Sequence, residues 1–345
     1  MVGRWRRGNL LTGIDQRAVA IYAPIQSRLN RVEERLRSLD GEAIPDLQTL
    51  LDHVLSSGGK RVRAAITLLA SDFYPHDDEK PIIMSVAIEL LHLATLIHDD
   101  TVDDSDLRRG KATVSNRWGK HIAVLFGDYV FAASATFVCD TENVRVIRRF
   151  SKTKMELASG EIIEYFNCYK PQQARELYQD RIYRKTASLF RTAAETGAIL
   201  GNAPEHQVQA LTDYGYNMGM AFQIVDDLLD VQGDPRELGK PVGNDLLQGV
   251  LTLPSIMLLE RYPENNPISK LFQNSSQDSS QSNPNNEELL RQAMEMIHNS
   301  DIIADCFTII RDYCAKASAS LDLLPECPAK ESLSRLPQYI RERTR

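Results

Sequence analysis

Two clusters of aspartates carry the clearest chemical signal in this sequence. The first lies in HDDTVDDSDLRRG, residues 98–110. On a helix, Asp99 and Asp103 would lie one turn apart on one face, and Asp106 would continue the stripe. Like charges at this spacing repel, so the arrangement makes sense if a hard cation lies between them. Carboxylates suit Mg²⁺, which typically binds one or two of them together with substrate phosphates. The cluster therefore predicts a magnesium site.

The second cluster repeats the same spacing. In FQIVDDLLDV, residues 222–231, Asp226 and Asp230 stand four residues apart, with Asp227 beside the first. They are surrounded by apolar residues, where a carboxylate needs a partner or a metal because unpaired charge is costly to bury. A solvated acidic helix end, neutralised by Arg108 and Arg109, is the alternative for the first cluster alone. The repeated spacing favours a pair of metal-binding motifs.

Basic residues supply the other half of a site for anions. SSGGKRVR, residues 56–63, places Lys60 and Arg63 one turn apart at the expected start of a helix, behind two glycines. Backbone amides at a helix N-terminus together with a basic pair form an anion site. Lys185 and Lys240 add isolated positive charges. The stretch lacks the GxxxxGK[ST] frame of a nucleotide P-loop, and its alternative interpretation is a glycine turn with solvated basic residues.

Composition limits the class of protein. The 345 residues carry a formal net charge of −7, which argues against general binding to nucleic acid. The five cysteines have no CxxC spacing, which argues against a zinc site or a disulfide framework. They fit a protein of the reducing cytoplasm. The basic start lacks the apolar run of a secretory signal. The apolar segment from Pro81 to Ile97 contains Glu89 and His92 and is short for a membrane span, so we expect a cytoplasmic protein without stable membrane insertion.

The elements that must position these residues are helices. No proline lies between Pro81 and Pro171 or between Pro171 and Pro204, which leaves room for long helices with apolar residues at helical spacing. The sequence predicts an all-α fold and a mobile polar loop at 273–286, rich in Ser, Asn and Gln. Helices are expected at 15–39, 46–55, 61–73, 82–104, 115–138, 142–166, 172–200, 204–232, 250–260, 287–297 and 301–323.

The motifs above, taken in their order along the chain, resemble those of the trans-type polyprenyl diphosphate synthases, in particular the long-chain octaprenyl and solanesyl type. The matching segments are GGKRVR (58–63), HLATLIHDDTVDDSDLRRG (92–110), GDY (127–129), KTASLF (185–190), FQIVDDLLD (222–230) and GKPVGND (239–245). The resemblance covers about residues 15–260. It implies an isoprenoid synthase-type helical bundle around a deep central cavity, as a single domain over 1–345 and usually as a homodimer.

The resemblance also implies an activity: Mg²⁺-dependent head-to-tail condensation of isopentenyl diphosphate with an allylic diphosphate. By family pattern, Mg²⁺ ions clamp the allylic diphosphate and are held by Asp99, Asp103, Asp226 and Asp230. The positive cage around the leaving diphosphate would be completed by Arg108, Lys185 and Lys240. Thr186 and Gln223 match positions whose neutral oxygen dipoles line the pocket of the allylic cation.

Isopentenyl diphosphate is expected to bind beside the allylic site. The matching positions are Gly59, Lys60, Arg63, His92 and Arg109. The departing diphosphate is the expected proton acceptor. Two positions depart from the family pattern: Ala64 stands where many relatives have proline, and Val250 stands where many have lysine, so one diphosphate contact is in doubt.

Small residues before the first aspartate predict a long product. Relatives that stop at farnesyl diphosphate have a bulky aromatic ring four or five residues before that aspartate, where this chain has Thr95 and Ala94, with Ala87 two turns deeper. We expect six or more isoprene units, for quinone side chains, with Phe131 or Phe137 as the floor of the tunnel. Alternatively, Ala94 and Ala87 only permit close helix packing.

Other functions remain to be separated from this one. A shorter-chain farnesyl or geranylgeranyl synthase would share every motif. A head-to-head synthase or terpene cyclase would not need the GGKR site for a second diphosphate. A non-catalytic subunit of a heteromeric synthase should have degraded aspartate motifs, and both are intact here. A phosphohydrolase built on His98 and Asp99 would need further histidines at ligand spacing, and the seven present are scattered.

Overall fold

The chain folds as a bundle of helices, as the proline-free stretches predict. The computed structural model describes residues 16–39, 44–56, 58–232, 242–277 and 284–342. In its first half the helices are α1 (Gln16–Tyr22), α2 (Gln26–Arg37), α3 (Pro45–Leu55), α4 (Val62–Ser71), α5 (Glu79–Val102), α6 (Val114–Trp118), α7 (Lys120–Cys139) and α8 (Val144–Asn167). A 3₁₀ turn at Ala23–Ile25 joins α1 to α2, where the sequence predicted one unbroken helix. The all-α prediction is confirmed.

The second half continues the bundle. Its helices are α9 (Arg175–Ile182), α10 (Ser188–Leu200), α11 (Glu205–Gln232), α13 (Asn244–Leu247), α14 (Leu253–Arg261), α15 (Pro267–Gln277), α16 (Pro284–His298), α17 (Ile302–Ser320) and α18 (Pro328–Arg341). A π-helical turn at Tyr183–Ala187 joins α9 to α10, and a 3₁₀ turn at Leu321–Leu323 follows α17. Among the described residues, strands occur only as β1 (Leu107–Arg108) and β2 (Lys111–Ala112), a short antiparallel hairpin.

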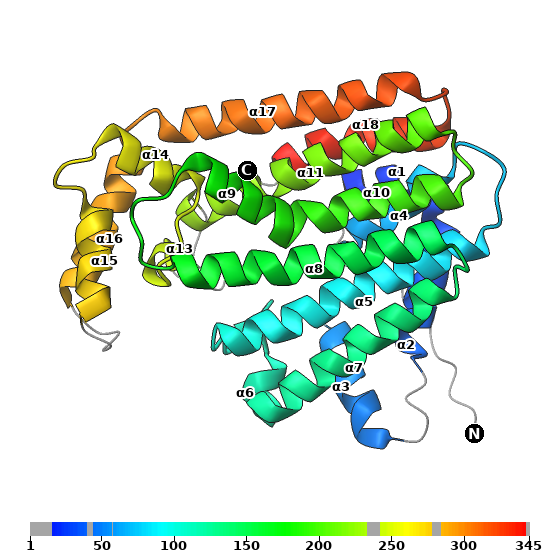
Figure 1. The fold of residues 1–345 in the computed structure, drawn as a ribbon, viewed down its shortest axis with the longest axis horizontal. Coiled ribbons are helices and arrows are strands. Elements are labelled where there is room, and N and C mark those ends of the chain that lie inside the picture. Colours follow the sequence, from blue (N-terminus) through cyan, green and yellow to red (C-terminus); the bar gives the residue numbers. More distant parts are fainter. Residues whose placement is uncertain (1–15, 40–43, 57, 233–241, 278–283, 343–345) are drawn as a thin grey trace.

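The layers of the bundle are visible in Figure 1. The helix α10 lies centrally and packs against α4, α5, α8 and α11, while α17 covers the outer side of α11. Small residues allow this close approach: a Cβ atom added at Gly197 of α10 would lie 2.3 Å from the backbone oxygen of Thr67 on α4. The buried apolar side chains of the described residues form one core that runs through all these helices.

Several helices differ from the sequence predictions at prolines. The helices α15 and α18 were not predicted. Pro267 and Pro328 each stand at the first position of their helix, where proline is tolerated. The predicted loop at 273–286 is helical at both ends, since α15 runs to Gln277 and α16 begins at Pro284. Residues 278–283, in the middle of that loop, lie outside the described part of the chain.

Among the described residues, two helices are long and apolar enough to cross a membrane by length and composition alone, so the expectation that the apolar segment is too short was wrong. They are α5, with 24 residues, and α7, with 20. In the fold, α5 packs against α2, α4, α7 and α10, and 67% of its apolar stretch is buried. In α7 only 33% of the corresponding stretch is buried. The composition of α5 is therefore explained by the core, while α7 keeps an apolar face on the surface.

Candidate active site

The first aspartate motif lies at the C-terminal end of α5. Asp99 is half-buried in the last turn, and Asp103 is exposed just beyond it, where its backbone N–H donates to the Asp99 carbonyl at 2.8 Å. The two residues are one turn apart, as predicted. Asp106 does not continue the stripe, because α5 ends at Val102. The carbonyl of Asp106 instead accepts the backbone N–H of Thr113 at 3.0 Å.

The middle aspartate of this motif has a structural partner. Asp100 is buried, at 6% exposure, and accepts a hydrogen bond from Arg108 Nε at 2.7 Å. Arg108 ends the strand β1, and the chain turns back through Arg109 and Gly110, which have φ of 51° and 76°. Left-handed conformations at both central residues fit the tight hairpin turns that match the strand twist. The hairpin thus holds one arginine against the end of α5.

Carboxylates gather around Asp99. Burial raises the pKa of Asp99 to about 8, and the negative charges of Glu161 on α8 and of Asp103 add to the rise, while Lys185 and Arg108 oppose it. A cation among these carboxylates would favour the charged form and reverse the shift. Among the described residues no group of three or more His, Cys, Asp or Glu could hold a metal unaided. This donor set fits Mg²⁺, which takes one or two carboxylates and completes its shell with water and phosphate oxygens.

Lys185 lies within the π-helical turn and faces the acidic end of α8. Its ammonium nitrogen is 2.5 Å from an oxygen of Glu164 and 2.9 Å from one of Glu161. Burial lowers the pKa of Lys185, but the two carboxylates outweigh burial and raise the pKa above its ordinary value. Gly160 permits this contact, since a Cβ atom there would lie 2.8 Å from Lys185 Cγ. The lysine is therefore held charged near Asp99.

Thr186, next along the π-helical turn, connects to the second aspartate motif on α11. Its hydroxyl donates to Gln223 Oε1 at 2.6 Å, and Gln223 Nε2 donates to Asp227 at 2.9 Å. Asp227 also accepts the hydroxyl of Tyr178 on α9 at 2.5 Å. Burial raises the pKa of Asp227 despite these two donors. The middle aspartate of this motif, like that of the first, is turned into the protein and bonded there.

Asp226 and Asp230, the other two aspartates of this motif, are both half-buried on α11. The carbonyl of Asp230 accepts the N–H of Gly243 at 2.8 Å, and the N–H of Asp245 lies 3.4 Å from an oxygen of its carboxylate. The π-helical turn thus reaches both motifs: Lys185 acts on Asp99, and Thr186 bonds Gln223, three residues before Asp226. Lys240, predicted for this region, lies outside the described residues.

The GGKR segment forms the entrance to α4. Arg61 takes a left-handed conformation, with φ of 47°, and its guanidinium bonds Glu33 at 2.5 Å and Glu89 at 3.2 Å. Arg61 therefore points into the protein and fixes the loop. Lys60 is exposed, and its ammonium lies 5.4 Å from the ring centre of Tyr339 on α18. This neighbour was not expected from the sequence, because α18 was not predicted.

The other residues predicted for the second diphosphate converge beside this loop. The Arg63 guanidinium stacks 4.6 Å from the ring centre of Phe190. Burial and then the charges of Arg63 and Arg109 hold the pKa of His92 well below its ordinary value. The side chain of Arg109 donates to the carbonyl of Gly58, and a Cβ atom on Gly59 would be 3.4 Å from the same guanidinium. Predicted residues from α4, α5 and the hairpin thus form one basic cluster with a neutral histidine.

The residues predicted to set product length lie on α5 and α7. Ala87 and Ala94 are fully buried, and α5 packs extensively against α7. The Thr95 hydroxyl donates to the His92 carbonyl at 2.8 Å. Phe131 is half-buried on α7, and the ammonium of Lys154 on α8 lies 3.5 Å from its ring centre. Phe137, two turns further along α7, is also half-buried.

Comparison with known proteins identifies the family. The model of the polyprenyl synthetase family matches residues 44–288. The chain belongs to the polyprenyl synthetase family. Heptaprenyl diphosphate synthase component 2 of Bacillus subtilis is 34% identical, over 95% of this chain and 92% of that protein. The crystal structure of heptaprenyl diphosphate synthase from Staphylococcus aureus has a TM-score of 0.86 and 33% identity, over 93% of this chain and 98% of that one.

Membership confirms the predicted fold class and enzyme class: the protein is a prenyltransferase with the helical fold of polyprenyl synthases. The structure of a polyprenyl synthase from Caulobacter crescentus, described as complexed with calcium and isoprenyl diphosphate, has a TM-score of 0.85. It is 30% identical and covers 96% of this chain and 98% of that one. Long-chain synthases recur among the curated relatives, and names for short-chain products occur there as well.

Four site residues were missed by sequence reasoning. Asp227 was noted only as a neighbour in its motif and Asp100 was not singled out, although an offset of one residue turns a helical side chain by about 100° and therefore into the bundle. Glu161 and Glu164 went unnoticed on α8, although two acidic residues at i and i+3 on a partly apolar helix could have signalled them. The tertiary contact with Lys185 is what gives them a place in the site.

The bonding of Asp227 predicts a loss of stability when its carboxylate is removed. Asp227→Ala leaves the Tyr178 hydroxyl and the Gln223 amide without their buried acceptor, which should lower the free energy of unfolding by about 1–3 kcal/mol. Urea denaturation followed by circular dichroism measures the change. Asp213→Ala is the matched control, because Asp213 is an exposed aspartate on the same helix. Equal stabilities of the two variants would contradict a structural role for Asp227.

Proposed function

We propose that the protein is a magnesium-dependent trans-polyprenyl diphosphate synthase. It joins isopentenyl diphosphate to an allylic diphosphate, head to tail, and gives a product of six or more isoprene units. The observation that carries this proposal is the π-helical turn, whose Lys185 and Thr186 reach both aspartate motifs, with the basic cluster around His92 close by. Two diphosphates need two sites of positive charge, and the cations around Asp99 and those around His92 are the candidates for them.

The allylic site is assigned to the aspartates and the π-helical turn. Asp99, Asp103, Asp226 and Asp230 would hold Mg²⁺, which supplies the positive charge that lets a diphosphate bind among carboxylates and leave with its electrons. Lys185 and Arg108 direct further positive charge at the same oxygens, and Lys240 is assigned there from its motif alone. Thr186 and Gln223 present neutral dipoles to the carbon that becomes positive when the C–O bond breaks.

Isopentenyl diphosphate is assigned to the basic cluster. Lys60, Arg63 and Arg109 are cations for its diphosphate, with Gly59 allowing close approach to the backbone. His92, held neutral, can donate one hydrogen bond without adding charge. The double bond of isopentenyl diphosphate forms the new C–C bond to the allylic carbon. A proton then leaves the adjacent carbon for the released diphosphate, which regenerates an allylic double bond one unit longer.

Removal of the first aspartate of either motif should abolish turnover. Asp99→Ala or Asp226→Ala takes away a carboxylate that acts mainly on charge developing as the diphosphate leaves, so kcat should fall by roughly two or more orders of magnitude with the fold intact. Incorporation of labelled isopentenyl diphosphate measures it. The control is Asp104→Ala, since Asp104 is an exposed aspartate of the same segment that pairs with Lys120. Normal turnover in the first two variants would refute the assignment.

The same assay addresses the non-catalytic alternative. The relative from Bacillus subtilis is named a component, so a heteromeric assembly is the competing reading for this chain. The intact motifs and the bonded middle aspartates favour a catalytic chain. Product formation by the purified chain alone, with Mg²⁺ and both diphosphates, is the expected result. A chain that needs an added partner for activity would favour the heteromer.

The two substrate sites should respond to different lysines. Lys60→Ala should raise KM for isopentenyl diphosphate about tenfold and leave KM for the allylic primer unchanged, because one charged hydrogen bond is lost at one site. Lys185→Ala should impair use of the allylic primer instead. Initial rates with each substrate varied in turn give the four constants. If both variants showed the same pattern, the division of cations between the sites would be wrong.

A homodimer is proposed from the apolar surface of α7 and α8. Ile122, Val124 and Leu125 are exposed on α7, and Leu125 is 65% exposed. The adjacent helix α8 exposes Met155, Ile162, Tyr165 and Phe166. Exposed apolar side chains along two neighbouring helices support an interaction site, and a second copy can cover them about a two-fold axis.

Disruption of the apolar surface of α7 should give a monomer. Leu125→Glu places a charge where the proposed interface excludes water, so the mass measured by light scattering should fall to that of one chain. Ile44→Glu is the control, since Ile44 is exposed at 57% just before α3, away from that surface. An unchanged mass in Leu125→Glu would place the dimer contact elsewhere.

A reducing cytoplasm remains the proposed location, in keeping with the five free cysteines.

A long product is proposed from the small residues of α5. The growing chain would run from the aspartates along α5, past Ala94 and then Ala87, towards Phe131 or Phe137 on α7.

Ala94→Phe should stop growth near farnesyl or geranylgeranyl diphosphate with an undiminished first condensation. Ala87→Phe lies about 10 Å deeper, from seven residues at 1.5 Å each, and should release longer products than Ala94→Phe. Chromatography of the lipid products measures both. An unchanged product in Ala94→Phe would show that the chain does not pass this residue.

A further inference from the structure

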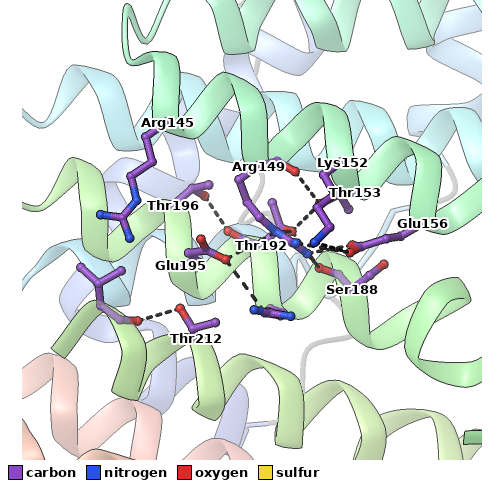
Figure 2. Close-up of polar contacts among 12 residues, drawn as sticks. Arg145, Arg149, Lys152, Thr153, Glu156, Ser188, Thr192, Glu195, Thr196 and Thr212 are labelled. Atoms are coloured by element: carbon purple, nitrogen blue, oxygen red, sulfur yellow. Dashed lines mark hydrogen bonds and ion pairs between the residues drawn. The ribbon is translucent and has the colours of Figure 1, made fainter. Parts of the chain in front are cut away.

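A buried network of charged and hydroxyl side chains lies between α8 and α10, outside the assigned substrate sites. At its centre is Arg149 of α8, whose side chain is 6% exposed (Figure 2). Its guanidinium donates to Glu156, which lies about two helical turns further along α8, at 2.8 Å. It also donates to the hydroxyl of Thr192 on α10 at 2.9 Å. Glu195 of α10 lies 3.4 Å from the same guanidinium. The network therefore ties the two helices together through one arginine.

The same network contacts the π-helical turn at both ends. Glu156 accepts the hydroxyl of Tyr183, the first residue of the turn, at 3.1 Å. Arg149 lies 3.5 Å from the carbonyl of Ser188, the first residue after the turn. The Tyr183 hydroxyl accepts in addition from Arg191 at 3.2 Å. The turn that carries Lys185 and Thr186 is thus bracketed by contacts to a single buried ion pair.

The geometry of the turn explains why such contacts are needed. The N–H of Ser188 bonds the carbonyl of Tyr183, five residues back, in place of the four of an α-helix. Such a widened turn is rare, is found mainly at functional sites, and persists when its surroundings hold it in place. It also changes the direction of the side chains within it. Lys185 and Thr186 can therefore reach the two aspartate motifs only while the turn keeps this form.

A buried ion pair is not an efficient way to stabilise a fold. Well-packed apolar residues of similar volume are often as stable or more stable, because two charges must lose their water. Stability alone thus gives no account of why Arg149 and Glu156 occupy this place. Charge-assisted hydrogen bonds, unlike apolar contacts, fix a direction and a distance. The pair is suited to hold one particular arrangement of the turn.

We propose that Arg149, Glu156 and Tyr183 are positioning residues for the allylic site: they fix the π-helical turn and so place Lys185 and Thr186. None of the three touches substrate. The inference rests on the proposed role of Lys185 and Thr186. It predicts that loss of the network changes use of the allylic primer much more than use of isopentenyl diphosphate, since the residues of the basic cluster belong to α4, α5 and the hairpin and meet α10 through the stacking of Arg63 on Phe190.

The sharpest test removes the hydroxyl through which the first residue of the turn meets the network. Tyr183→Phe keeps the ring and deletes the hydroxyl that bonds Glu156. We expect kcat/KM for farnesyl diphosphate to fall about tenfold, because small misplacements of positioning groups have effects of this order. KM for isopentenyl diphosphate should stay within about twofold of its original value. Tyr214→Phe is the matched control: it deletes a fully buried tyrosine hydroxyl that bonds the Leu333 carbonyl of α18 at 2.7 Å, away from the turn.

A second variant separates positioning from stability. Arg149→Met with Glu156→Leu replaces the ion pair by apolar side chains, which should largely preserve the melting temperature. The expected result is a stable protein with the same selective loss for farnesyl diphosphate as Tyr183→Phe. A stable double variant with normal kcat/KM would overturn the proposal, and so would equal losses in Tyr183→Phe and Tyr214→Phe. Lys185→Ala is measured alongside: if it leaves use of farnesyl diphosphate unchanged, the proposed allylic site itself is wrong.

Discussion

The like charge of carboxylates and diphosphates is the constraint on which this site depends. A protein that uses aspartates to hold a diphosphate must keep negative charge at half-buried helix ends without losing its fold. The chain divides the task within each motif. Asp100 and Asp227 turn inward and are bonded by Arg108 and by Tyr178 with Gln223, while their neighbours Asp99 and Asp226 stay half-buried. The inward aspartates hold the helix ends so that the outward ones can carry charge.

The π-helical turn positions the positive charge of Lys185, as the inward aspartates position the helix ends. It brings Lys185 beside Glu161 and Glu164, and Thr186 beside Gln223, so that α8 and α11 meet at five residues of irregular helix. Small residues make this possible: a Cβ atom at Gly160 or Gly219 would lie within 3 Å of the turn. The shape of the turn, rather than the mere presence of a lysine, decides which oxygens its ammonium can reach.

The proposed second anion site is built on different elements, the entrance to α4, the middle of α5 and the RRG hairpin. Arg61 is turned inward to Glu33 and Glu89, so its charge is paired within the protein while the adjacent Lys60 stays exposed. Lys60 meets the ring of Tyr339 on the last helix, so the C-terminal part of the chain also contributes to this site. The residues of the two proposed sites lie on different elements, which meet where Arg63 stacks on Phe190 of α10.

The sequence by itself determined the helical class, the two aspartate motifs and the basic pair Lys60 and Arg63, whereas His92 and Arg109 were assigned through the family resemblance. Those features depend on the spacing of residues that are close together in the sequence, which can be read without knowledge of the fold. Only the tertiary structure decided which aspartates face inward, that Glu161 and Glu164 flank Lys185, and that α18 reaches Lys60. These contacts join residues distant in sequence, and the π-helical turn inserts one residue of register that no periodicity of 3.6 predicts. Where a side chain points after such a turn depends on the helices packed around it.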